Sequence, residues 1–371
     1  MSSTLKRPTK HTQIITAMRA GILDGTYQRD QRLPSETELG EQFQATRATV
    51  GKAMRELEHA GLISRRRGSG SFVRPPEGQG MLTFAILVTA LGEGEIFEPI
   101  CNELAMSLAE RNHRLLWGQS STQNHDERCQ HAERLCHSYI AQKVDGVFFA
   151  PIELTSRMDE ANTRIADLLE RAGIPVVLLD GDVAKHPMRS RFDLIGIDNH
   201  RVGHVLANHF LDAGCSRIAF ICLPHSAPTV DARIAGYREA LFNRGIPFQP
   251  DWVKRGDPTD AAFIDALLKE TPPEAVICGN DYTAALLIAA LLRRGVRIPA
   301  DIRISGVDDV KYARLLAVPV TTIRQPCQAI GRAAASAMLD RIAQPDLPGR
   351  DIRLDLNSDH PTVVALPKAG E

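Results

Sequence analysis

The feature that most constrains the fold of this chain is an alternation of short apolar runs with longer amphipathic segments, beginning at Met81. Runs such as LTFAILV, VDGVFFAP, IPVVLLD, RIAFICL and EAVICG are continuous and apolar, as strands buried on both faces of a sheet are. Segments with helical periodicity, such as FEPICNELAMSLAERN, lie between them. This alternation predicts an α/β fold with parallel sheets covered by helices on both faces. Residues 81–371 are too many for one such sheet and suit two.

Composition argues against membrane and secreted proteins. No apolar run reaches the about 18 residues that a membrane-spanning helix needs. The first residues, MSSTLKRPTK, are polar and basic and lack the apolar stretch of a secretory signal. We therefore expect a cytoplasmic protein with no membrane partner, and not a transport binding protein.

The seven cysteines are scattered, and none forms a C-x-x-C pair. Cys129, His131, Cys136 and His137 are close in sequence, but they lie in a helical stretch that offers only a partial ligand set. We expect an ordinary helix there, with no metal and no other cofactor.

Charge is distributed unevenly along the chain. Residues 1–76 contain thirteen Lys and Arg and seven Asp and Glu, a net charge of +6, so the remainder carries −7 of the total of −1. A basic N-terminal segment on an acidic body indicates a polyanionic partner for that segment alone.

The basic segment has three helical patterns followed by a hairpin. The second pattern starts at LPSETEL, where Ser35 and Glu38 form a capping box. The third, RATVGKAMRELEHAG, has Thr46 as its N-cap and Gly61 at its end. In LISRRRGSGSFV, two β-prone runs flank a Gly-rich turn. Three helices and a basic hairpin predict a winged helix-turn-helix.

The third helix of such a fold enters the major groove with its N-terminal side chains on base edges. Arg47 can pair bidentately with a guanine, and the hydroxyls of Thr46 and Thr49 can reach bases or phosphate. Lys52 and the arginines 65–67 can neutralise phosphates.

The stretch LPSETELGEQFQATRATVGKAMRELEHAGLISRRRGSGSFV resembles the winged helix of the GntR family, and the likeness covers roughly residues 10–74. It implies a double-stranded, pseudo-palindromic DNA operator as partner. Gly51 departs from the family, which commonly has arginine there. The residues predicted to contact DNA, from the pattern and the resemblance together, are Ser35, Thr37, Thr46, Arg47, Thr49, Lys52, Arg65, Arg66, Arg67 and Gly68.

Polar residues follow several predicted strands of the acidic body, where ligands bind in parallel α/β sheets. Asp180 follows IPVVLLD, Asn280 follows AVICG, and Asp308 follows ISGV. The alternative for such residues is N-capping of the next helix. We favour capping for Asp198, which follows LIGI. For Asn280, Asp308 and Arg233, the last at a helix start, ligand contact is favoured mainly by the resemblance described next.

From about residue 83 onward the chain resembles the LacI/GalR-type effector domain, which has the periplasmic-binding-protein-like fold. VDGVFFAP, GIPVVLLD, IDNHRVGHVLANHFLDAGCSRIAFI and AVICGNDYTAALLIAALLRRGVRIPADIRISGVDD carry the likeness. It implies two lobes joined by crossovers near residues 193, 324 and 353, with the ligand between them. The effector residues it implies are Asp180, Arg233, Asn280 and Asp308, with first-lobe contacts around Phe97 and Gln119.

The expected organisation is a winged helix-turn-helix in residues 1–74, a linker in 75–81 and a two-lobed effector domain in 82–371. The first lobe is expected in 82–193 and 325–353, and the second in 194–324 and 354–371. This combination resembles the arabinose-responsive regulator subgroup of the GntR family.

The function we expect is ligand-responsive transcriptional regulation, as a repressor and homodimer that senses a sugar. A nucleoside, a polyol or a cationic metabolite stays open as the effector, and so does the direction of its effect on DNA binding. An α/β enzyme fused to a DNA-binding segment is the remaining alternative. We disfavour it because no phosphate-binding glycine loop follows a strand and no G-x-S-x-G elbow occurs.

Overall fold

The computed structural model describes residues 9–23, 26–28, 31–59, 62–66, 69–73, 81–88, 96–118, 125–318 and 320–356. The chain divides into two compact units, Met1–Gly80 and Met81–Glu371. The division falls inside the segment 75–81 that was predicted as the linker.

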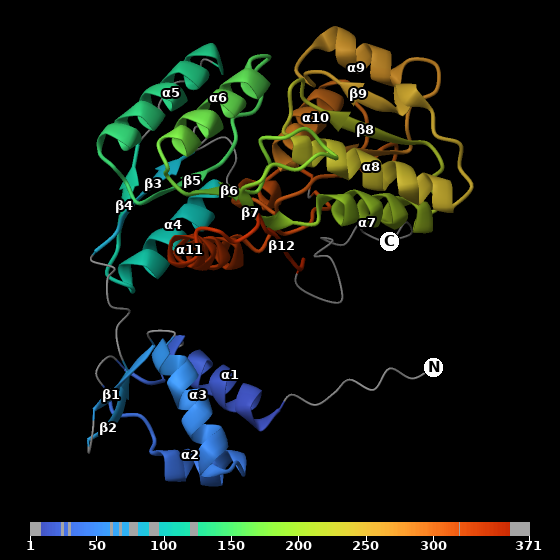
Figure 1. The fold of residues 1–371 in the computed structure, drawn as a ribbon. Coiled ribbons are helices and arrows are strands. Elements are labelled where there is room, and N and C mark those ends of the chain that lie inside the picture. Colours follow the sequence, from blue (N-terminus) through green and yellow to red (C-terminus); the bar gives the residue numbers. More distant parts are fainter. Residues whose placement is uncertain are drawn as a thin grey trace. The chain divides into compact units, whose positions relative to one another are not determined.

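In its described residues, the first unit contains three helices and a two-stranded antiparallel hairpin (Figure 1). Its elements are α1 (Lys10–Leu23), α2 (Glu36–Phe43), α3 (Arg47–His59), β1 (Ile63–Arg66) and β2 (Gly70–Val73). Its core is formed by apolar residues from all of them, including Ile14, Met18, Leu39, Val50, Met54, Leu57, Ile63 and Val73. The predicted capping box at the start of α2 is confirmed: Ser35 Oγ accepts from Glu38 N (3.2 Å), and a Glu38 carboxylate oxygen accepts from Ser35 N (2.6 Å). The order helix–helix–helix–hairpin is that of a winged helix-turn-helix.

The second unit contains two parallel sheets. The six-stranded sheet has the order β12-β7-β6-β5-β3-β4. Its strands are β3 (Thr83–Leu87), β4 (Arg114–Trp117), β5 (Gly146–Phe149), β6 (Val176–Leu179), β7 (Asp193–Ile197) and β12 (Asp351–Leu354). The four-stranded sheet has the order β11-β10-β8-β9. Its strands are β8 (Ile218–Cys222), β9 (Val253–Arg255), β10 (Ala275–Cys278) and β11 (Arg303–Ser305). We call the parts built on these sheets the first and the second lobe.

Helices cover both faces of each sheet, as the apolar strands require (Figure 1). The first lobe has α5 (His125–Ala141) and α6 (Met158–Arg171) on one face, and α4 (Phe97–Ala109) and α11 (Cys327–Ala343) on the other. The second lobe has α7 (Asn199–Asp212) and α8 (Pro228–Asn243) on one face, and α9 (Ala261–Leu268) and α10 (Asp281–Arg293) on the other. Short 3-10 turns lie at Pro250–Trp252 and Lys311–Arg314.

The first crossover lies later than predicted. β7 pairs in parallel with both β6 and β12, so residues 194–197 belong to the first lobe, and the chain crosses over after Ile197. The run DLIGI is a buried strand and not part of the connection, which is why the boundary near 193 was wrong. Residues 357–371, which were predicted in the second lobe, lie outside the described part of the chain.

Two further features bear on the sequence predictions. Within the described ranges, no helix is both long and apolar enough to cross a membrane. The side chains of Cys129 and Cys136 lie buried in the apolar layer between α5 and the first sheet.

Candidate DNA-binding surface and effector cleft

The N-terminus of α3 presents an exposed polar surface. Thr46 caps the helix, because its Oγ1 accepts from Thr49 N (3.3 Å), and the two hydroxyls lie 2.9 Å apart. The Arg47 side chain is 89% exposed, and Lys52 is exposed one turn further on. The residues predicted to meet base edges are therefore accessible together at one helix end.

Glu36 of α2 lies between two of these arginines. One carboxylate oxygen is 3.6 Å from Arg47 Nε, and the other accepts a hydrogen bond from Arg65 of β1. Glu36 was not among the predicted site residues. It holds Arg47 and Arg65 near the α3 surface.

The other predicted DNA contacts are placed differently. The Ser35 hydroxyl already serves the α2 cap, whereas Thr37 is exposed on the first turn of that helix. The Arg66 guanidinium lies over the Phe72 ring, 4.7 Å from its centroid, which orients it along the hairpin. Arg67 and Gly68 lie outside the described residues.

No other backbone segment approaches Gly51 closely enough to require a glycine there. A Cβ at this position would meet only side-chain atoms of Arg55 and Glu36, at 3.7 Å or more. The glycine is thus not required by packing within the described part of this unit.

Arg233 of α8 is the centre of the candidate effector cleft. It is 4% exposed, its Nε donates to Asn199 Oδ1 (2.8 Å), and its Nη1 donates to the carbonyl oxygen of Gly279 (2.5 Å). These bonds fix the guanidinium between the start of α7 and the loop after β10. Arg233 lies close enough to Asp180 and Asp308 to lower the pKa of both carboxyls.

Burial has the larger effect on those carboxyls. It raises the pKa of Asp308 to about 8, where Arg233 opposes the shift and the carboxylates of Asp281 and Asp180 add to it. It also raises the pKa of Asp180, again against the effect of Arg233. Asp308 Oδ1 accepts from Gln325 Nε2 (2.8 Å), so the second crossover contributes a polar partner that was not predicted.

Helix capping accounts for two of the strand-end residues. Asp198 caps α7 by accepting from Arg201 N (3.1 Å), as predicted. Asn280 caps α10, because its Oδ1 accepts from both the amide (2.9 Å) and the hydroxyl (2.7 Å) of Thr283. We had favoured ligand contact over capping for Asn280. Its side-chain Oδ1 is used by the cap, so only its Nδ2 is left for a ligand.

The first-lobe contacts are less complete. Phe97 begins α4, is 8% exposed, and packs into the apolar core. Gln119 lies outside the described residues. Glu153, in the loop after β5, is a further carboxylate of the cleft. Asp180 was predicted because it follows a buried strand, and Glu153 could have been predicted in the same way.

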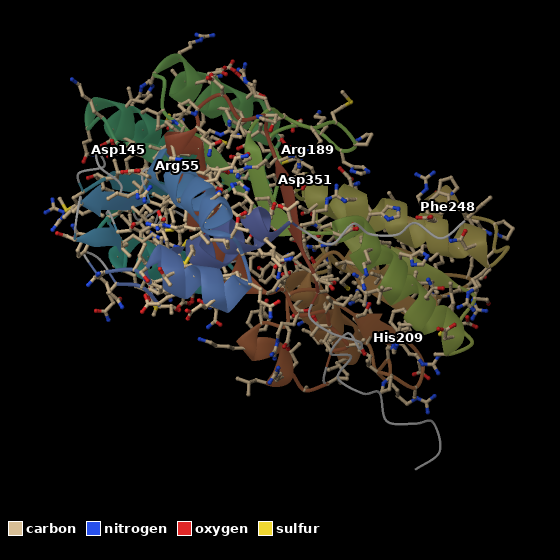
Figure 2. The ribbon with its side chains drawn as sticks, turned by 60° about the horizontal axis from the view of Figure 1, so that its bottom comes forward. Arg55, Asp145, Arg189, His209, Phe248 and Asp351 are labelled. Atoms are coloured by element: carbon tan, nitrogen blue, oxygen red, sulfur yellow. The ribbon has the colours of Figure 1, made fainter. Side chains whose placement is uncertain are left out.

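Two cavities adjoin this cluster. One of about 500 Å³ is lined by residues of both lobes, from Ile96 and Asn102 at α4 to Asp308 and Gln325. Another of about 350 Å³ is lined by Asp180 and Asn199, and also by Arg189 and Asp351, which form an ion pair (3.1 Å; Figure 2). Neither cavity is lined by Arg233 or Asn280: Asp180 lines the smaller cavity and Asp308 the larger one, so the four predicted effector residues do not line one pocket.

Two family models match this chain. Residues 10–73 match the bacterial regulatory proteins of the gntR family, and residues 207–357 match the periplasmic binding protein-like domain. The chain therefore combines a GntR-type helix-turn-helix with a periplasmic-binding-protein-like α/β domain, as predicted.

Relatives along nearly the whole chain are named as repressors. The arabinose metabolism transcriptional repressor of Geobacillus stearothermophilus is 28% identical over 90% of this chain and 92% of its own length. The HTH-type transcriptional repressor CytR of Escherichia coli is 27% identical over 91% of each chain.

Solved structures show the same fold. A complex of the transcriptional regulator CelR with cellobiose has a TM-score of 0.62 at 22% identity, and the match covers 94% of this chain and 97% of that one. A LacI family regulator from Enterococcus faecium with bound ribose has a TM-score of 0.58 at 24% identity and matches 73% of this chain and 94% of its own.

Proposed function

We propose that this chain is a transcriptional repressor that binds a pseudo-palindromic operator as a homodimer and responds to a small sugar held between its two lobes. The observation that carries the DNA-binding part is the exposed N-terminus of α3, where Arg47 projects beside Thr46 and Thr49. A sugar is favoured because the names or titles of three similar proteins mention arabinose, cellobiose and ribose.

The effector is proposed to change operator affinity by linkage. A ligand that contacts both lobes stabilises the closed arrangement, and any difference in operator affinity between closed and open protein follows from that preference. A two-fold symmetric dimer matches a pseudo-palindrome, because each half-site then contacts an identical winged helix-turn-helix.

Arg47→Ala should weaken binding to the selected operator by about 1–3 kcal/mol, because a bidentate contact to guanine is lost. The operator is first selected from random duplexes with the unaltered protein, and affinity is then measured at several salt concentrations. Arg19→Ala removes the same charge from the exposed face of α1 and serves as the matched control. Equal operator affinity of the Arg47 variant and the unaltered protein would contradict the recognition-helix assignment.

Asp308 should make sugar affinity depend on pH. Sugar hydroxyls donate hydrogen bonds to the ionised carboxylate, and the pKa of Asp308 is raised to about 8 by burial. Binding to the ionised form then releases a proton, so affinity should rise by up to about tenfold per pH unit below pH 8 and level off above it.

Calorimetry with pentoses, hexoses and polyols between pH 6 and pH 9 measures this effect. Asp308→Asn should bind the same sugar more weakly and without the rise. Asp346→Asn, which changes an exposed aspartate between α11 and β12, should keep the rise. A rise of equal size in the Asp308 variant would place the titrating group elsewhere.

A further inference from the structure

The loop after β5 reaches from the first lobe to the second. The Asn162 side chain holds it in place: its Oδ1 accepts from Ile152 N (2.7 Å), and its Nδ2 donates to Ile152 O (2.8 Å). In the next residue, Glu153 Oε2 accepts from Ala227 N (3.2 Å), the N-cap of α8. A carboxylate of the first lobe thus stands at the end of the helix that carries Arg233.

The backbone beside Glu153 also bridges the lobes. Leu154 N donates to the carbonyl oxygen of His225 (2.7 Å), and both residues have positive φ, 62° and 56°. Asp180 (63°) and Asp308 (118°) share this feature. Such left-handed conformations are strained for non-glycine residues and persist only where surrounding contacts hold them, as at ligand clamps. The backbone directly after Glu153 is therefore held against the second lobe.

Glu153 adds a third carboxyl to the cleft, beside those of Asp180 and Asp308. Burial raises the pKa of its carboxyl, the Ala227 N–H lowers it, and the nearby Asp180 carboxylate raises it again. The charge of Arg233 lowers the pKa of Glu153 as it lowers those of Asp180 and Asp308, so the three carboxyls lie within electrostatic reach of one guanidinium. Arg128 of α5 adds a second positive charge near Glu153.

Little of the hydrogen-bonding capacity of Arg233 is available to a ligand. Two of the three guanidinium nitrogens of Arg233 are already hydrogen bonded, to Asn199 and to Gly279. A carboxyl oxygen, by contrast, is available to a ligand. Asp180 Oδ1 is buried and has no hydrogen-bond partner in the described part of the chain. A phosphate or carboxylate in this cleft would face three carboxyls, whereas hydroxyl or amine donors would satisfy them.

We infer that Glu153 is a specificity-determining residue of the cleft, which together with Asp180 and Asp308 excludes anionic effectors and selects an uncharged or cationic ligand rich in hydrogen-bond donors. This inference rests on the proposed effector function. It narrows the effector to unphosphorylated sugars and chemically similar donors.

The test compares each uncharged sugar with its own phosphate ester. Calorimetry is run on the full chain with D-ribose and D-ribose 5-phosphate, and with L-arabinose and L-arabinose 5-phosphate. The unaltered protein should bind at least one free sugar, and the ester of that sugar at least tenfold more weakly. Glu153→Gln keeps an oxygen for the Ala227 N–H but removes the charge, so the ratio should shrink about tenfold, as expected for one charge a few ångströms away in a partly buried site.

Two variants control for indirect effects. Glu110→Gln removes the same charge from an exposed position at the end of α4 and should leave the ratio unchanged. Glu153→Asp keeps the charge and should retain the discrimination even where Glu153→Gln lowers the thermal stability. Tighter binding of an ester by the unaltered protein, or an unchanged ratio in Glu153→Gln, would overturn the inference. Failure of both free sugars to bind would also contradict it, while operator binding by α3 tests the regulator function separately.

Discussion

Replacing Gly203 with alanine should destabilise the effector domain by about 3 kcal/mol, at the upper end of the cost of overpacking a core. A Cβ on Gly203 of α7 would lie 1.8 Å from the carbonyl oxygen of Arg233 in α8. The contact from α8 to α7 is equally close, since a Cβ on Gly236 of α8 would lie 1.9 Å from the carbonyl oxygen of His200 in α7. Both obstacles are backbone atoms, so no rotamer change relieves them, and the two helices must separate.

Thermal unfolding and sugar calorimetry measure the two consequences. The melting temperature should fall by about 6 °C or more in a domain of this size. Sugar affinity should fall as well, because the displaced segment of α8 carries Arg233. Gly181→Ala is the matched control, since its Cβ would have no neighbour closer than 4.0 Å. A Gly203 variant with an unchanged melting temperature would show that α7 and α8 do not pack at this distance.

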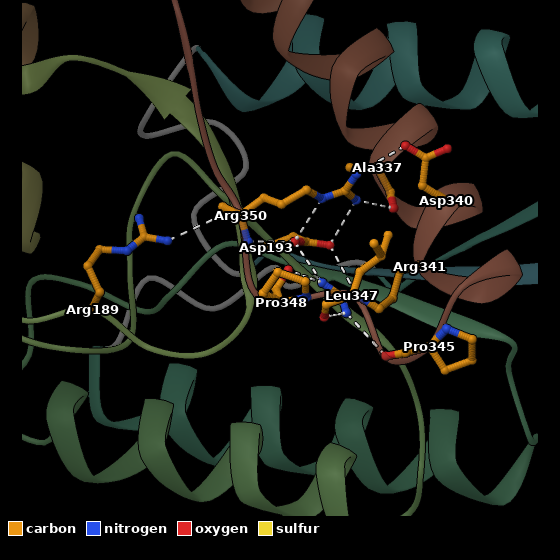
Figure 3. A network of polar contacts seen from close by, with 9 residues as sticks. All are labelled: Arg189, Asp193, Ala337, Asp340, Arg341, Pro345, Leu347, Pro348 and Arg350. Carbon is orange, nitrogen blue, oxygen red and sulfur yellow. Dashed lines mark hydrogen bonds and ion pairs between the residues drawn. The ribbon is translucent and has the colours of Figure 1, made fainter.

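Replacing Asp193 with alanine should cost about 3–5 kcal/mol, because it leaves two guanidinium groups without their buried counter-charge. Asp193 begins β7 and is fully buried. Figure 3 shows its contacts with Arg341 and Arg350. Its Oδ1 accepts from Arg341 Nη2 (2.9 Å) and Arg350 N (2.8 Å), and its Oδ2 accepts from Arg350 Nη2 (3.1 Å). The network ties the strand before the first crossover to α11 and to the segment before β12.

The same carboxylate predicts an acid-dependent loss of stability. Burial alone would raise the pKa of Asp193, but hydrogen bonds from Arg350 and Arg341 outweigh it and lower the pKa. A lowered pKa stabilises the fold above the unfolded value of about 3.9, and this stabilisation is lost as pH falls through the folded value. Denaturant unfolding between pH 7 and pH 3 should show this component in the unaltered protein and not in Asp193→Ala.

Asp340→Asn provides the control from the same network. Asp340 accepts from Arg350 Nη1 (3.0 Å), but its side chain is 59% exposed. An exposed ion pair contributes at most about 1 kcal/mol. Equal losses for Asp193→Ala and Asp340→Asn would contradict the view that burial makes Asp193 the centre of the network.

Local sequence patterns predicted the elements of the fold well. Helix caps are local: each side-chain oxygen accepts a hydrogen bond from an amide three residues away. The capping box of Ser35 and Glu38 and the Asp198 cap of α7 are of this kind. The two parallel sheets followed from apolar runs alternating with helical periodicity. The error at the first crossover arose because a strand that leads into a connection has the same apolar pattern as any other strand.

The cleft was predicted less completely, for a physical reason. Asp180 and Asp308 could be found because carboxyl ends of parallel strands are where ligands bind. The sequence does not reveal that Arg233 donates to Asn199, or that Glu153 meets the N-terminus of α8, because these contacts join residues far apart in the chain. Phe97 had been expected at the ligand by resemblance, and its burial in the apolar core could not be read from its place in the chain.

The sequence by itself determined that this chain has a GntR-type head and a two-lobed α/β body, since hydrophobic period, caps and turn residues act over a few neighbours. Only the tertiary structure decided which polar groups meet. The backbone contact of Gly203 with Arg233, the pairing of Asp193 with two arginines, and the hydrogen bond from Ala227 to Glu153 all depend on how separate elements pack. Packing removes these groups from water, and a buried polar or charged group destabilises the fold unless it is paired.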